Sequence, residues 1–276
     1  MKKLALVCLV AMACERTVNA PKQPAPKPAP TIEEDRDADN LLNMAYGASV
    51  VSRTGELNLE VSAAHAIDSS WASSWVSSPG VPDETLVYSL LAPSRITNIG
   101  ITPLEGNEMP RRVAFDGSMD GKQWRELATM DVRNNNERQL APMQPAIARY
   151  IRVRSLERGR YYVRVRAFHA LGEEVEQPVP PPFTGCWTIN GRPAQLVQQG
   201  ARITGTIAAN PVIEIDGGTD NRVALVSWRQ GPMWGHAALT RTPDGAHLTG
   251  ITFYETFDLS NMGEAWFAER CGAAGG

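Results

Sequence analysis

Strict alternation of apolar and polar residues marks two stretches in the first half of the chain. In "RYIRVR", residues 149–154, Ile151 and Val153 alternate with arginines, and in "YVRVRAFH", residues 162–169, valines do the same. Successive side chains of a strand point to opposite faces, so this period of two predicts strands that bury one face. "RITNIGIT", residues 95–102, is a further candidate. No stretch shows the period of an amphipathic helix, and strands separated by turns are typical of a β-sandwich.

A hairpin is predicted by "RRVAFDGSMDGKQWREL", residues 111–127. Val113 and Phe115 alternate as in a strand, and two Asp-Gly pairs, which favour turns, come before Trp124. We expect Asp116 and Asp120 to be turn residues. The turn would then return the tryptophan ring to the same sheet.

The N-terminus has the pattern of an export signal. Lys2 and Lys3 precede an apolar run from Leu4 to Val10, and Ala11-Met12-Ala13 has the small-x-small form of a cleavage site. The run is too short to cross a bilayer, so residues 1–13 are predicted to be a signal peptide and the protein to be exported.

Cys14 directly follows this signal, and "AMAC" resembles the lipobox of bacterial lipoproteins. The resemblance implies acylation of Cys14 and a membrane anchor. The residues after the cysteine, Glu15 and Arg16, include no aspartate retention signal, which favours the outer membrane. The alternative is ordinary cleavage, which leaves a free thiol.

Two proline-rich segments predict the division of the chain. Residues 14–40 contain "PKQPAPKPAP" and a charged run, typical of a disordered linker or stalk, and "EEVEQPVPPP" occupies residues 173–182. We therefore expect one domain over 41–172 and another over 183–276. The net charge of −3 argues against a nucleic-acid partner, and the 43% hydrophobic content suffices for two cores.

The second domain is predicted to be a closed barrel. Seven or eight short strands joined by glycine and Asp-Gly turns are indicated between residues 194 and 269. Cys186 and Cys271 are the only cysteines beyond the signal segment and Cys14, and in an exported protein they should form a disulfide. A disulfide requires α-carbons within about 7 Å, so the first and last strands should be neighbours.

This half resembles the small up-and-down barrels of the lipocalin type. Gly185-Cys186-Trp187 and Arg270 match a motif in which an arginine of the last strand covers the tryptophan of the first. A barrel of this size can be filled by its own side chains. Trp228, Met233 and Trp234 either pack in that core or line a mouth for an apolar ligand.

The first domain resembles the coagulation factor 5/8 type C, or discoidin, family. Four features occur in the order of that family: "NMAYGASVVS" from Asn43, "AIDSSWASSW" from Ala66, "SMDGKQWREL" from Ser118 and "ARYIRVR" from Ala148. The resemblance implies a jelly-roll β-sandwich of the galactose-binding type, with Trp75 and Trp124 in its core. The whole chain is thus expected to be all-β, a jelly-roll sandwich followed by a small up-and-down barrel.

Relatives in this family bind sugars, lipid head groups or proteins through loops at one end of the sandwich, so the resemblance implies a binding module. Many also hold a structural calcium near the aspartate that matches Asp68, with Ser73 as a candidate helper. Here Ser69 replaces the usual glycine and Ala167 the usual late glutamate. Calcium takes six to eight oxygen ligands, so calcium is possible but not required, and Asp68 could instead cap its own turn.

Aromatic and basic side chains are the candidate ligand-binding residues. Trp71 and Tyr161 could stack on a sugar ring, although Trp71 could also cover the core. Four arginines alternate with apolar residues and could bind phosphate or carboxylate, or could form a solvated strand face balanced by acids elsewhere in the fold: Arg152, Arg154, Arg164 and Arg166.

No catalytic motif accompanies the four histidines, so we expect no enzyme. The sequence favours an envelope-anchored lipoprotein that binds a glycan or another envelope ligand through the discoidin-like domain, with no cofactor required. The alternatives are a protein–protein scaffold of the envelope, or a carrier of a small apolar ligand in the barrel.

Overall fold

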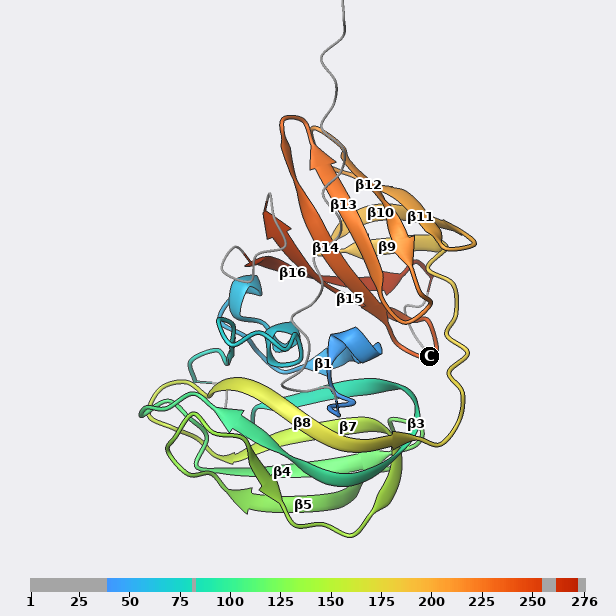
Figure 1. Ribbon diagram of the computed structural model, residues 1–276. Helices are drawn as coiled ribbons and strands as arrows, with labels where there is room; N and C mark the ends of the chain where they lie inside the picture. Colours follow the sequence, from blue (N-terminus) through green and yellow to red (C-terminus); the bar gives the residue numbers. More distant parts are fainter. Residues whose placement is uncertain (1–38, 81–82, 255–261, 273–276) are drawn as a thin grey trace, which may run out of the picture. The chain divides into compact units, whose positions relative to one another are not determined.

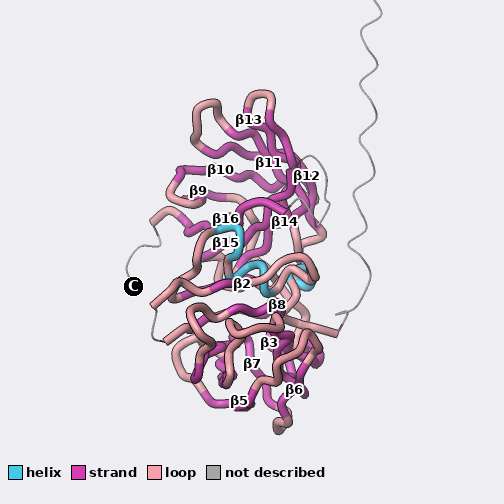
Figure 2. Tube along the Cα trace, turned by 90° about the vertical axis from the view of Figure 1, so that its left-hand side faces the viewer, coloured by secondary structure: helices cyan, strands magenta, loops and turns pink. Residues whose placement is uncertain are grey.

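The computed structural model describes residues 39–80, 83–254 and 262–272 (Figure 1). The signal peptide, Cys14 and nearly all of the first proline-rich segment lie outside these residues and remain predictions. Within the described part of the chain, no helix is long and apolar enough to cross a bilayer. Strands make up most of it, and helix is confined to short turns (Figure 2).

The first half forms one eight-stranded antiparallel sheet that folds into a sandwich. Three short 3-10 helices lie near its start: η1 (Met44–Tyr46), η2 (Leu59–Val61) and η3 (Ala63–Ala66). The strand order is β2-β8-β3-β7-β4-β5, and β1 and β6 both pair with β3. The strands are β1 (Ser49–Arg53), β2 (Trp75–Val76), β3 (Thr85–Pro103), β4 (Arg112–Ser118), β5 (Arg125–Asp131), β6 (Gln139–Ala141), β7 (Ala146–Glu157) and β8 (Arg164–Glu174).

Strand β3 links the parts of this sheet. Its first half pairs with β1, its second half pairs with β8 and β6, and β7 pairs with both halves. Its register with β7 shifts between Ser89 and Ser94, and both faces are buried over this stretch. One long strand therefore contributes to every layer of the sandwich.

The core contains the residues that the alternation indicated. Ile151, Val153 and Val165 are buried, and Trp75 is 2% exposed. The ring of Phe168 lies 6.0 to 6.5 Å from the rings of Trp75, Tyr88 and Phe115. The predicted all-β sandwich is confirmed.

The β4–β5 hairpin contains one of its two expected turns. Asp120 Oδ1 accepts hydrogen bonds from the backbone N–H groups of Lys122 and Gln123, and Gly121 has a φ of +71°. Asp116, in contrast, lies within β4 and is buried, so its assignment to a turn is wrong. Trp124 is half-buried beneath the guanidinium of Arg152, 4.6 Å from the ring centroid, so the expectation that Trp124 lies in the core is also wrong.

The second half is a closed eight-stranded barrel in which consecutive strands are antiparallel neighbours, as predicted. Strand β16 pairs with β9 to close it. The strands are β9 (Gly185–Ile189), β10 (Arg192–Gln199), β11 (Arg202–Ile207), β12 (Ile213–Thr219), β13 (Ala224–Gln230), β14 (Met233–Arg241), β15 (His247–Tyr254) and β16 (Met262–Arg270).

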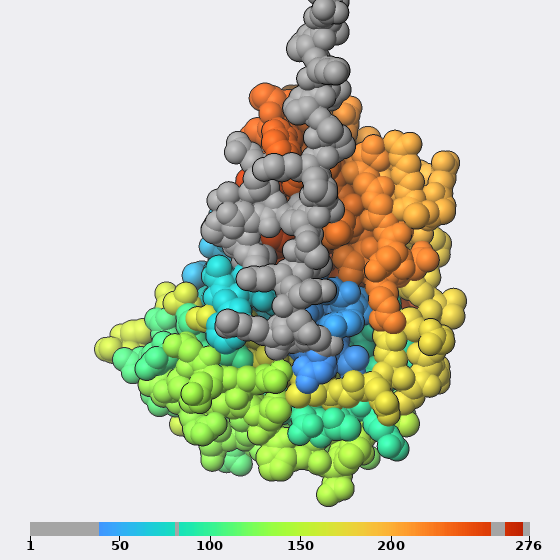
Figure 3. Space-filling model, in the orientation of Figure 1, coloured from blue at the N-terminus to red at the C-terminus, as the bar shows by residue number. Residues whose placement is uncertain are grey.

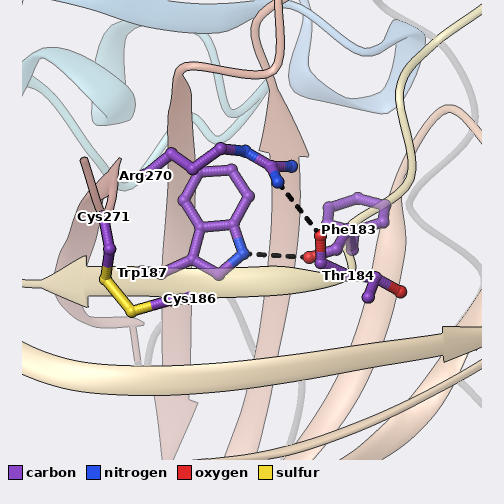
Figure 4. The surroundings of a disulfide bond; sticks show 6 residues. All are labelled: Phe183, Thr184, Cys186, Trp187, Arg270 and Cys271. Atoms are coloured by element: carbon purple, nitrogen blue, oxygen red, sulfur yellow. Dashed lines mark hydrogen bonds between the residues drawn. A yellow bond between two sulfur atoms is a disulfide. The ribbon is translucent and has the colours of Figure 1, made fainter. Parts of the chain in front are cut away.

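The seam between β9 and β16 contains the predicted disulfide (Figure 4). Cys186 and Cys271 are bonded, with α-carbons 5.3 Å apart. The guanidinium of Arg270 lies over the ring of the buried Trp187, 4.7 Å from its centroid, and donates to the carbonyl of Thr184. Gly185 has a φ of +151°, and a Cβ there would lie 2.7 Å from Arg270 Nη1, so this close packing requires glycine.

The barrel interior is filled by its own side chains. Its core includes Trp187, Leu196, Ile215, Trp228 and Leu239. Trp228 therefore packs in the core. Met233 and Trp234, on the β13–β14 hairpin, are 55% and 48% exposed, and core packing is the wrong assignment for them.

The outer face of the barrel contributes to the core of the sandwich. Ile251, Phe253 and Ala265 belong to the same cluster of buried residues as Trp75 and Phe168. The N–H of Val50 in β1 donates to Thr249 Oγ1 in β15 at 2.9 Å. Figures 1 and 3 show the blue segment with η1 and β1 next to the barrel strands. The division at residues 173–182 remains a prediction, and the two sheets share buried surface.

Candidate functional site

A pocket of about 230 Å³ opens on the sandwich, where the loop before β2 meets the end of β3 and the start of β8. The loop supplies Ser69, Ser70 and Trp71. Thr102 comes from β3, and Arg138 precedes β6. Strand β8 supplies Arg166, Ala167 and His169. Thr102 and Ala167 are partners in the β3–β8 pairing, so the register of these two strands places the polar floor beside the loop.

The loop that carries Trp71 is held by its own side chains. Asp68 Oδ1 accepts hydrogen bonds from the N–H of Ser70 and from the hydroxyl of Ser73, both at 2.8 Å. Ser69 has a φ of +62°, in the left-handed region that glycine adopts more readily than serine. These contacts fix the backbone so that the indole of Trp71 remains 45% exposed.

Arg166 and Trp71 form a stacked pair in the pocket. The guanidinium carbon of Arg166 lies 4.8 Å from the centroid of the indole ring. Burial, and then the neighbouring charge of Arg164, lower the pKa of Arg166. The stacked ring holds the planar guanidinium in one orientation. The flexible ammonium group of a lysine would not be held in this way.

His169 and Thr102 form the polar floor, and both are 2% exposed. Asn40 Oδ1 accepts from the N–H groups of Leu42 and Ala170, so the Asn40 amide nitrogen is a donor. It donates to the carbonyl of Phe168 and to His169 Nδ1, at 3.0 and 3.4 Å.

The tautomer of His169 follows from these contacts. Since Nδ1 accepts, Nε2 carries the hydrogen and donates to Thr102 Oγ1 at 2.7 Å. Burial, and then the charge of Arg138, lower the pKa of His169 to about 3, so the ring is neutral at physiological pH. Because the oxygen of Thr102 already accepts from the ring, its own hydrogen is available to a ligand in the pocket.

The other predicted ligand residues lie outside this pocket. Arg164 Nε lies 3.4 Å from Ser74 Oγ, and Tyr161 is 56% exposed on the turn between β7 and β8. Arg152 and Arg154 both pair with the buried Asp116, at 2.9 and 2.7 Å. Their guanidiniums are thus engaged by an acid of the neighbouring strand. The structure brings together only Trp71 and Arg166 of the predicted set.

Asp68 and Ser73 are in contact, and calcium binding by them stays a prediction. Ser73 directs its hydrogen to Asp68, and no group of three or more His, Cys, Asp or Glu side chains that could hold a metal is found in the described ranges. Burial raises the pKa of Asp68 to about 7, although hydrogen bonds from Ser70 and Ser73 lower it. Asp68 Oδ2 is buried and has no hydrogen-bond partner among the described residues, and a calcium ion there would need further oxygen ligands around it. Asp68 caps its own turn.

Asn40, Thr102, Arg138 and His169 were not predicted as site residues. They come from four separate parts of the chain, and none belongs to a recognisable motif. The one available signal was the break in alternation after Arg166, where Phe168 and His169 are both buried.

Comparisons with known proteins agree with this fold. The family model described as F5/8 type C domain matches residues 48–167, which confirms the resemblance drawn from the four sequence features. No curated protein sequence matches the chain.

Three similar solved structures match about half of this chain and nearly all of their own chains. The C-terminal domain of a chitobiase from Bacteroides fragilis is 21% identical over 47% of this chain and 96% of its own, with a TM-score of 0.43. The family 32 CBM of Clostridium perfringens NanJ, in complex with galactose, is 16% identical over 47% and 96%, with a TM-score of 0.42. CpGH89CBM32-5 from the same organism, in complex with GalNAc-β-1,3-galactose, is 14% identical over 48% and 99%, with a TM-score of 0.41.

Proposed function

We propose that this protein is a non-catalytic carbohydrate-binding protein that takes a sugar in the pocket beside Trp71. The pocket carries the proposal, because it combines an exposed indole, a fixed hydroxyl donor and two arginines around about 230 Å³. This volume is below the 300–1,000 Å³ usual for drug-sized ligands, and so suits one or two sugar rings. Aromatic faces stack on the apolar faces of sugars, and a rigid hydroxyl selects the position of a sugar oxygen.

The match of residues 48–167 to the F5/8 type C model supports a binding module rather than a catalyst. The pocket lining offers a neutral buried histidine and two arginines, but no pair of carboxylates for glycoside hydrolysis. We also propose attachment to the cell envelope through an acylated Cys14, which rests on the sequence signal alone. The intact mass of the protein from its native membranes tests this attachment.

A glycan array with the whole chain tests the binding proposal. We expect signals for a restricted set of glycans, and at least a tenfold loss of affinity in Trp71→Ala. Trp234→Ala is the matched control, because Trp234 has nearly the same exposure, 48% against 45%, but lies on the barrel. No signal from any glycan would overturn the proposal, as would equal binding by the chain and Trp71→Ala.

A second candidate function is protein–protein interaction through the barrel. Val212, Met233, Trp234 and Tyr254 are large hydrophobic residues with about half of their surface exposed. A partner that binds the whole chain and Trp71→Ala equally, but not Trp234→Ala, would favour this scaffold function. The carrier of a small apolar ligand has less support, because side chains fill the barrel core.

A further inference from the structure

The pocket is positively charged, and this charge points to the class of sugar. Its lining includes Arg138 and Arg166 and, among the described residues, no aspartate or glutamate. Arg138 Nη1 lies 3.5 Å from Asp39 Oδ1, and both side chains are exposed. No described acid lies within ion-pair distance of Arg166.

The surroundings of Arg166 differ from those of Arg152 and Arg154 on the same sheet. Arg152 and Arg154 share Asp116, whereas Arg166 has only the indole of Trp71 against its face. Its Nε is buried and has no hydrogen-bond partner among the described residues. The protein thus encloses Nε, and the terminal nitrogens of Arg166 are the donors that remain for a ligand in the pocket.

The donors of the pocket converge on an acceptor. The guanidinium of Arg166 stacks on the indole and lines the pocket, and a planar guanidinium can bind a carboxylate through two parallel hydrogen bonds from its terminal nitrogens. The hydroxyl of Thr102 donates as well, because His169 Nε2 occupies its oxygen. Arg138 adds a second positive charge at the rim.

We propose that the sugar bound in this pocket is acidic, with a carboxylate that Arg166 holds through its N–H edge and that Arg138 and Thr102 assist. The inference rests on the proposed carbohydrate binding and specifies the class of sugar. A hexuronic acid unit within a polysaccharide has this chemistry: a carboxylate on a ring whose apolar face can lie against an aromatic side chain.

Three related kinds of oligosaccharide test whether the pocket recognises a negative charge on the sugar. Oligosaccharides of galacturonic acid and of glucuronic acid are compared with their methyl esters, which keep the shape but lose the charge, and with oligosaccharides of the corresponding neutral hexoses. Isothermal titration with the whole chain at low and at high salt gives the affinities. We expect at least one acid to bind about tenfold more tightly than its ester, and the advantage to shrink as salt rises.

Variants assign the effect to its residues. Arg166→Gln should abolish the preference for acid over ester, and Arg138→Gln should reduce it by about threefold. Arg192→Gln is the control, since it removes the same charge from an exposed position on β10 of the barrel. Arg166→Lys keeps the charge but loses the planar edge, so it should retain only part of the preference. Unchanged thermal midpoints establish that the variants fold.

The outcomes separate the two proposals. Equal binding of acid and ester by the unmodified chain would overturn the acidic-sugar inference and leave carbohydrate binding intact. A preference for acid that survives in Arg166→Gln would overturn the assignment to this arginine. Binding to sulfated neutral glycans but to neither uronic acid would overturn the proposal that the bound group is a carboxylate. Absence of binding to every glycan of the array would instead overturn carbohydrate binding itself.

Discussion

Three arginines of the sandwich and two of the barrel are held in different ways. In the sandwich, Arg152 and Arg154 bind the carboxylate of Asp116, and Arg158 lies 3.2 Å from the buried Glu84. In the barrel, Arg241 lies over Phe183 and Arg270 over Trp187, and both donate to backbone carbonyls. Among the described residues, neither Arg241 nor Arg270 has a carboxylate within ion-pair distance.

This difference determines how much positive charge each arginine presents to its surroundings. A carboxylate cancels the field of an arginine, whereas an aromatic face and carbonyl oxygens orient the guanidinium and leave its positive charge in place. Arg166 lies in the sandwich but is held in the manner of the barrel, by a ring alone. For this reason Arg166 keeps a positive charge that Asp116 partly offsets for Arg152 and Arg154 on β7.

The largest expected effect on stability comes from removing the disulfide that closes the barrel. The described part of the sandwich has no such bond. Replacing both Cys186 and Cys271 by serine opens a loop with a sequence separation of 85 residues. The free energy of unfolding should fall by about 4–5 kcal/mol, because the unfolded chain regains the entropy that the disulfide removed. Urea unfolding followed by tryptophan fluorescence measures it. The parent protein under reducing conditions should match the variant, and a loss below 1 kcal/mol would contradict the expectation.

The next effect concerns an arginine held without an acid. Arg241 is 1% exposed, and burial lowers its pKa to about 10, so it stays charged at neutral pH. Arg241→Lys keeps the charge, but an ammonium group cannot both stack on Phe183 and reach the carbonyls of Pro181 and Asn221. We expect a loss of about 2 kcal/mol that changes little with salt.

Chemical denaturation at two salt concentrations checks this result. Arg192→Lys is the control, because Arg192 is exposed on β10 and the change there should cost little. Equal stability of Arg241→Lys and the parent protein would show that a point charge serves as well as a planar group.

The smallest effect concerns the paired arginines. Burial raises the pKa of Asp116, but hydrogen bonds and charges from Arg154 and Arg152 outweigh it, and the net result is a lowered pKa. Asp116 therefore stabilises the fold above its unfolded pKa of about 3.9, and this contribution is lost as the pH falls through the folded pKa. Asp116→Asn should cost about 1–2 kcal/mol at pH 7, since its partners are about one-third exposed.

The pH dependence distinguishes this pair from the barrel arginines. The difference in unfolding free energy between the parent and Asp116→Asn should shrink between pH 5 and pH 3, whereas that of Arg241→Lys should persist. Asp131→Asn is the matched control, because the Asp131 side chain is 90% exposed. A difference for Asp116→Asn that stays constant down to pH 3 would mean that its charge does not hold the arginines.

Local pattern predicted much of the fold. Alternation located β7 and β8 and their buried residues, and the export signal with two cysteines predicted the seam between β9 and β16. These features depend on period and on one covalent bond. Asp116 and Trp124 were misplaced because their environment is set by β7, which is distant in sequence and supplies Arg152 and Arg154.

The candidate site was predictable only in part, for the same reason. Trp71 and Arg166 were identifiable as an unusual aromatic and a basic residue on an alternating strand. Their meeting depends on the β3–β8 register and on the loop held by Asp68. The role of His169 depends further on which atom of Asn40 accepts, and no one-dimensional pattern contains that information.

Strand β15 divides its side chains between two interiors. Leu248 points into the barrel, while Thr249, Ile251 and Phe253 face the segment around β1. A fragment that stops at residues 173–182 would leave the segment around β1 uncovered. The barrel expressed alone would expose the apolar outer face of β15 to water. Both fragments should therefore be prone to aggregation. The sandwich is better studied together with the barrel than as an isolated fragment.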